Sequence, residues 1–104
     1  MVTSKLINKD NTQVLMANER VAVTSCFFCN TGEETEELTL YVSRSGQGTG
    51  KQNMLLSSLV ILPKETFTFN TERLILEQDG MLVAKCTYGN VASNISTMAL
   101  TEGA

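Results

Sequence analysis

The sequence contains no tryptophan and no histidine, and it has a single proline and three cysteines among its 104 residues. Because histidine is the commonest general base in enzymes and a common metal ligand, its absence argues against a hydrolase of the Ser-His type. No apolar run approaches the roughly 18 residues that a membrane span requires. The eight basic residues are scattered, whereas nucleic-acid-binding proteins gather them on one face. We therefore expect no catalysis, and neither nucleic acid nor a membrane as partner.

The residues that are present are typical of a globular domain. Hydrophobic residues make up 42% of the chain, and its length suffices to bury about two thirds of the unfolded surface without metal or disulfides. We expect one domain spanning residues 1–104. The first ten residues, MVTSKLINKD, lack the apolar stretch of a signal peptide, and three unpaired cysteines fit a reducing compartment.

The CFFC motif at residues 26–29 has the spacing of a redox motif or of half a zinc site. It lies inside an alternating strand pattern, where two residues three positions apart point to opposite faces. The thiols of Cys26 and Cys29 therefore cannot converge, and Cys86 is the only other cysteine. We expect three free thiols, with Cys29 and Cys86 as small core residues, and no metal or cofactor.

The dominant hydrophobic period is two, as in half-buried strands. Strands are predicted in the segments RVAVTSCFFCN, ELTLYVS, ETFTFNT, RLILEQ and MLVAKCTY. In ELTLYVS the alternation predicts that Thr39, Tyr41 and Ser43 face away from the core. The residues expected to face the core are Val21, Val23, Phe27 and Cys29, then Leu38, Leu40 and Val42, then Phe67, Phe69, Leu74 and Leu76, and finally Leu82, Ala84, Cys86 and Tyr88.

Turn signals separate these segments, and NTQVLMAN and ASNISTMAL read as the first and last strands. Asp79-Gly80 is a favoured two-residue turn and predicts a hairpin between residues 73–78 and 81–88. The segment QNMLLSSLVIL fits a buried strand, a strand with a bulge or a helical turn, and we choose the strand. The pattern predicts an all-β antiparallel β-sandwich, jelly-roll or Ig-like, of about eight short strands with little or no helix.

Two polar segments need a separate interpretation. The acidic run GEETEE at residues 32–37 lacks the alternating carboxylates of a calcium loop, so we expect a solvated turn. The stretch SRSGQGTGKQN at residues 43–53 is one spacer short of a phosphate-binding loop and lacks the hydroxyl after its lysine, which indicates a polar hairpin connection.

A long polar connection often contacts a neighbouring molecule, and so can a sheet face rich in hydroxyl groups. Two such faces are expected, one from Thr66, Thr68 and Asn70 and the other from Ser93, Ser96 and Thr97. The alternative is that both are ordinary solvated sheet faces. The candidate residues for contact with another subunit or partner are Ser45, Gln47, Thr49, Lys51, Thr66, Thr68 and Asn70.

Three stretches carry a family resemblance: VAVTSCFFCNTGEETEELTLYVSRSG, LVILPKETFTFN and RLILEQDGMLVAKC. Their motifs are Asn30-Thr31 before a strand with Thr39-Leu40-Tyr41-Val42, the turn from Pro63 to Thr66, and a Leu-x-Leu segment from Leu74 to Gly80. Together they resemble the small β-sandwich proteins of tailed-bacteriophage virions: head decoration, head-to-tail connection and tail-associated subunits.

The resemblance implies a structural protein without enzymatic activity that works as a homo-oligomer, a trimer or a ring. Its implied partners are copies of itself and the major capsid or tail proteins of the same virion. Its implied location is the virion, assembled in the cytoplasm of the bacterial host. The alternative is a monomeric β-sandwich module that recognises a glycan or a host receptor through its loops, for which Tyr88 beside Gly89 is the candidate contact.

Overall fold

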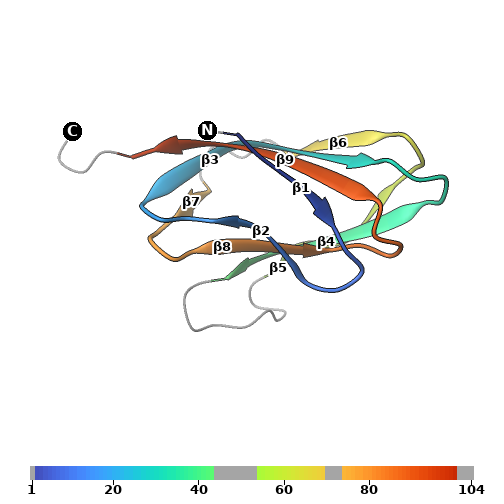
Figure 1. Ribbon diagram of the computed structural model, residues 1–104, viewed down its shortest axis with the longest axis horizontal. Coiled ribbons are helices and arrows are strands. Elements are labelled where there is room, and N and C mark those ends of the chain that lie inside the picture. The colour runs from blue at the N-terminus through green and yellow to red at the C-terminus, as the bar shows by residue number, and fades with distance from the viewer. Residues whose placement is uncertain (1, 44–53, 70–73, 101–104) are drawn as a thin grey trace.

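The computed structural model describes residues 2–43, 54–69 and 74–100, and these form nine strands and no helix (Figure 1). The strands are β1 (Val2–Ile7), β2 (Thr12–Met16), β3 (Val21–Asn30), β4 (Glu36–Ser43), β5 (Met54–Ile61), β6 (Thr66–Phe69), β7 (Ile75–Leu76), β8 (Met81–Lys85) and β9 (Val91–Ala99). All pairings are antiparallel, and the two sheets pack against each other, which confirms the predicted β-sandwich.

The strand order distinguishes between the two sandwich types that were predicted. Sheet A has the order β1-β9-β3-β6, with β7 also paired to β3, and sheet B has the order β2-β8-β4-β5. The pairs β1 with β9, β2 with β8, β3 with β6 and β4 with β5 are nested, as if one long hairpin had been rolled so that successive pairs fall in opposite sheets. This is the jelly-roll order and not the Ig order.

One hydrophobic core fills the space between the sheets. Phe28 of β3 and Ile95 of β9 contribute from sheet A, while Leu38, Leu40 and Leu82 contribute from sheet B, and all five are fully buried. Burying such side chains stabilises a fold by about 1.5 to 3 kcal/mol each. Residues of both sheets therefore form one continuous core.

Strand β3 differs from the prediction in its second half. Val23 faces the core as expected, but the pairing of β3 with β9 shifts between Val23 and Ser25. An extra residue in one strand reverses the alternation beyond it, so Phe28 points inward and Phe27 is 40% exposed. The prediction that Phe27 and Cys29 face the core was wrong, because the apolar pattern does not reveal a bulge.

Strand β4 is buried on both faces. Leu38 and Leu40 face the core as predicted, yet Thr39, Tyr41 and Ser43 on the opposite face are also buried, the most exposed of them at 8%. Strand β4 lies between β8 and β5, so its backbone hydrogen bonds are made on both sides.

Three further predictions need correction. Strand β1 was not predicted, because its apolar residues Val2 and Leu6 face outward. The Asp79-Gly80 turn exists, and Asp79 has a φ of 70°, but it carries the chain from β7 in sheet A to β8 in sheet B and so joins no hairpin. Tyr88 lies beyond the end of β8 and is 53% exposed, so it is not a core residue.

Two further predicted strands exist, but one of them has a different outer face from the predicted one. Strand β5 is confirmed, with irregular pairing to β4 and a positive φ of 50° at Ser58. Strand β9 is confirmed, but Ser93 and Thr97 share their face with Ile95 and are buried. The face predicted from Ser93, Ser96 and Thr97 therefore does not exist, and only Ser96 lies on the outside.

Candidate interaction surface

The outer face of sheet A consists of side chains that alternate with those in the core. The pairing registers place the following residues on it: Val2, Ser4 and Leu6 of β1; Ala92, Asn94, Ser96 and Met98 of β9; Ala22, Ser25, Phe27 and Cys29 of β3; Thr66 and Thr68 of β6; and Ile75 of β7. None of these strand residues carries a charge. We call this set the uncharged face.

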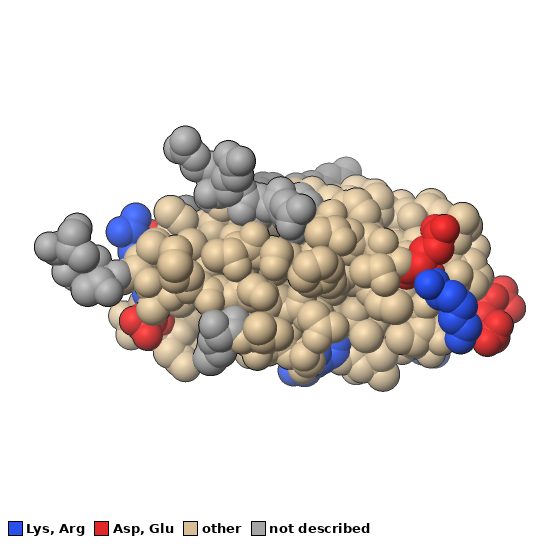
Figure 2. Space-filling view, turned by 90° about the horizontal axis from the view of Figure 1, so that it is seen from above, with Lys and Arg blue, Asp and Glu red and all other residues tan. Residues whose placement is uncertain are grey.

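The uncharged face is also rich in exposed apolar side chains. Ten large hydrophobic residues are exposed in the described part of the chain, and five of them lie here: Val2, Leu6, Phe27, Ile75 and Met98. Figure 2 looks onto this face and shows a broad surface on which the described residues present no charged groups, with their Lys, Arg, Asp and Glu side chains gathered at its two ends and along one border. A large exposed patch of this kind, bordered by polar residues, marks interaction sites in soluble proteins.

Phe27 lies near the centre of the uncharged face. In the pairing register Asn94 of β9 flanks it on one side and Thr68 of β6 on the other. Its position follows from the bulge in β3, which turns an apolar residue from the core to the surface. An exposed aromatic ring surrounded by small uncharged residues is the usual anchor of a protein interface.

Two hydrogen bonds at or beside this face satisfy polar groups within the protein. The Ser4 hydroxyl donates a hydrogen bond to Asn94 Oδ1, and the hydroxyl of Thr24, the residue at the register shift of β3, donates one to the carbonyl oxygen of Ser96 at 3.1 Å. Burying such groups under a partner protein costs less free energy than burying unpaired groups, because paired groups lose fewer hydrogen bonds to water.

The ends of sheet A carry the ion pairs. Arg20 Nε lies 3.2 Å from Glu77 Oε2 near the start of β3, and Lys64 Nζ lies 3.2 Å from Glu33 Oε1 near its end. Lys64 Nζ also donates to the carbonyl oxygen of Thr31 at 2.9 Å. These pairs are exposed and lie outside the uncharged face.

The structure describes two of the seven predicted contact residues. Thr66 and Thr68 are exposed and lie on the uncharged face, on the edge strand β6. Ser45, Gln47, Thr49, Lys51 and Asn70 lie outside the described residues. Sequence reasoning missed Phe27 as a surface residue, and no signal in the apolar pattern could have identified it without the bulge.

A second group of polar residues is buried at one end of the sandwich. Glu36 was expected in a solvated turn, but it is 0% exposed, and its carboxylate accepts hydrogen bonds from the backbone N–H groups of Tyr88 at 2.8 Å and Asn90 at 3.1 Å. The side-chain amide of Asn30 donates to the carbonyl oxygens of Glu34 and Ile61. These contacts fix loops, and we assign the group a structural role.

The cysteines are free and lie in different environments. Burial raises the pKa of Cys26 to about 11 and also raises the pKa of Cys86, so both are neutral thiols near pH 7. Cys29 is partly exposed on the uncharged face, so the core position predicted for Cys29 belongs to Cys26. Among the described residues, no group of three or more His, Cys, Asp or Glu is placed to hold a metal ion.

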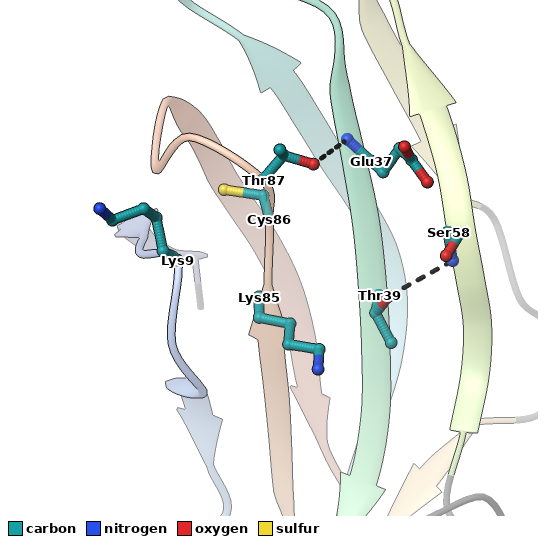
Figure 3. A pocket seen from close by; sticks show the side chains of 7 residues that line it. All are labelled: Lys9, Glu37, Thr39, Ser58, Lys85, Cys86 and Thr87. Atoms are coloured by element: carbon teal, nitrogen blue, oxygen red, sulfur yellow. Dashed lines mark hydrogen bonds between the residues drawn. The ribbon is translucent and has the colours of Figure 1, made fainter.

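A pocket of about 310 Å³ lies over sheet B on the other side of the molecule (Figure 3). Two of its hydroxyl groups already accept backbone hydrogen bonds: Thr87 from Glu37 N–H, and Thr39 from Ser58 N–H. The ammonium groups of Lys9 and Lys85 point away from each other. The pocket therefore has no convergent set of groups for a small ligand, and the uncharged face is the stronger candidate.

Comparison with known proteins identifies no relative of this chain. No family model matches it, and neither the curated proteins nor the solved structures give a significant match. The part of the chain that the structure describes contains no helix of the length and hydrophobicity needed to span a membrane.

Proposed function

We propose that the protein is a non-enzymatic structural subunit of a bacteriophage virion that works as a homo-oligomer, decorating or cementing the capsid or joining head and tail. The observation that carries this proposal is the uncharged face of sheet A. Depletion of charged residues at the centre of a patch, together with an exposed aromatic side chain, distinguishes interface cores from ordinary protein surface. A face of this kind suits a protein whose work is to contact other subunits.

The virion setting rests on the resemblance of the three sequence stretches and on analogy of fold. Jelly rolls occur in viral capsid proteins and also in lectins and cupins, so the fold alone does not select a function. The pocket on sheet B offers no convergent polar groups for a small ligand. The uncharged face is therefore the better candidate for a contact surface, and this favours assembly over ligand binding.

A second candidate is the monomeric binding module for a glycan or a host receptor. It is favoured by Tyr88, which is 53% exposed in the loop after β8, next to Gly89 with its positive φ. Aromatic rings on loops stack against sugar rings in many binding proteins, but here the described loops present only this one exposed large aromatic side chain.

Two measurements test the proposed function. We expect purified protein to be oligomeric by native mass spectrometry, and we expect the chain to be a multicopy component of gradient-purified particles of the phage that encodes it, by quantitative mass spectrometry. Absence from the particles would overturn the virion role. Absence combined with a monomeric state and with glycan binding that is lost in Tyr88→Ala would favour the binding module.

A further inference from the structure

We infer that the uncharged face binds the same face of a second copy, so that two sheets A pack against each other around a two-fold axis close to Phe27. This inference deepens the proposed function and rests on its homo-oligomeric part. It names the contact surface and makes a two-fold pair the basic unit, whereas the family resemblance implied a trimer or a ring.

The size of the face is close to that of a stable interface. Strand β9 has nine residues, so the face is about 30 Å long at about 3.3 Å per residue. Four strands in the main order of sheet A at a spacing of about 4.8 Å make it about 19 Å wide. Strands β1, β6 and β7 are shorter than β9, so the flat area of sheet A is about 490 Å² per copy, or about 980 Å² for two, close to the roughly 1,000 Å² expected of a biological interface.

The charge distribution makes the face compatible with itself. A two-fold contact brings the same patch of both copies together, so any net charge on the patch meets a like charge. The strand residues of this face carry none, while the ion pairs Arg20–Glu77 and Lys64–Glu33 lie at its ends. Among the described strand residues, a charged partner surface would find no complementary group, whereas a second copy meets no like charge.

The position of Phe27 suits an interface centre. Two rings that approach near a two-fold axis lose water together, and each is flanked by Asn94 and Thr68, which are small enough to let the sheets approach. Two flat sheets pack face to face at about 10 Å, as in the interior of a sandwich. The apolar residues Leu6 and Met98 extend the contact toward the edges of the face.

The decisive experiment measures the oligomeric state of the full chain across concentration. We expect sedimentation velocity and light scattering to give an even multiple of 11.4 kDa, with the pair present at tens of micromolar. Phe27→Asp should raise the dissociation constant of the pair at least about 30-fold, because it buries a charge at the centre of the contact.

Val60→Asp is the matched control. Val60 lies on the outer face of sheet B and is 58% exposed, more than Phe27, so the same change there should leave the dissociation constant within about twofold. Far-UV circular dichroism and cooperative unfolding check that each variant folds. Thr68→Lys changes an exposed residue beside Phe27 and serves if Phe27→Asp does not fold; it should weaken the pair at least about tenfold.

The outcomes separate this inference from the proposed function. Three results would overturn the face-to-face pair: an oligomer that stays intact in both Phe27→Asp and Thr68→Lys, equal dissociation in Val60→Asp, or an odd number of subunits. Each of them would leave the proposal of a homo-oligomeric virion subunit standing. A wild-type protein that stays monomeric at about 200 μM overturns the inference and also the homo-oligomeric part of the proposed function. Absence from virions alone, with the pair intact, overturns only the proposed function.

Discussion

At the scale of single residues, the buried carboxylate of Glu36 connects strand β4 to the turn between β8 and β9. A carboxylate removed from water is costly unless hydrogen-bond donors replace the lost hydration. The N–H groups of Tyr88 and Asn90 supply such donors, and both would lack this acceptor without Glu36. The residue therefore determines the stability of this turn.

We predict that Glu36→Ala lowers the free energy of unfolding by about 2 to 4 kcal/mol, since it leaves two backbone donors unpaired and a cavity behind. Glu36→Gln should cost less, because one oxygen remains to accept a hydrogen bond. Urea unfolding measures both, with Glu37→Ala as the control at an adjacent exposed residue, which should change stability by less than about 0.5 kcal/mol. Equal effects of Glu36→Ala and Glu37→Ala would show that the carboxylate does not hold the turn.

Cys26 gives a prediction about pH. Burial raises the pKa of its thiol from 9.0 to about 11, so above pH 9 the unfolded chain loses the proton and the folded protein keeps it. The folded state then binds more protons than the unfolded state, and stability falls as pH rises from about 9 to 11. At pH 10 this group should cost about 1.4 kcal/mol relative to pH 8.

Unfolding of wild type and Cys26→Ala at pH 8 and pH 10 measures the effect. The variant is expected to be less stable at both values because it loses packing, but its loss of stability between pH 8 and pH 10 should be smaller than that of wild type. The same decline in both proteins would assign the pH dependence to other groups.

At the scale of elements, the sequence predicts the existence of strands better than their faces. The alternation in β4, β6 and β8 places Leu40, Thr68 and Leu82 correctly. It fails in β3, where one extra residue reverses the alternation, and in β1, where the apolar residues Val2 and Leu6 face outward. Bulges and edge positions depend on which strand lies next to the one in question, and the residue pattern of one strand does not reveal its neighbour.

The turn between β8 and β9 permits a test of local conformation. Gly89 has a φ of 81°, and a Cβ atom added there would meet no atom closer than 3.7 Å, so conformation and not space limits substitution. We predict that Gly89→Ala lowers the free energy of unfolding by about 1 kcal/mol, because alanine is strained at positive φ. Gly89→Asn should cost less, because asparagine tolerates this region. Thermal unfolding of the two variants measures the difference, and an alanine variant as stable as wild type would contradict it.

At the scale of the whole molecule, the jelly-roll order is set by contacts between distant parts of the chain. Strand β1 pairs with β9, for example Val2 with Ser96, and composition and turns carry no information on such partners. The same holds for the candidate surface. The sequence identifies Thr66 and Thr68 as exposed, but only the order of β1, β9, β3 and β6 shows that their face carries no charged strand residue.

An uncharged contact predicts how association responds to salt. Raising sodium chloride from about 50 to 500 mM shortens the Debye length from about 14 to about 4 Å, which weakens charge interactions and leaves apolar contacts in place. The dissociation constant of the wild-type pair should therefore change less than about threefold over this range, and sulfate should strengthen the pair, because it favours burial of apolar surface. Thr68→Lys places like charges close together across the axis, so its pair should become tighter as sodium chloride increases. Sedimentation at several salt concentrations measures both proteins. A wild-type pair that weakens more than tenfold in salt would mean that the charged ends, with Arg20, Glu77, Lys64 and Glu33, carry the association in place of the uncharged face.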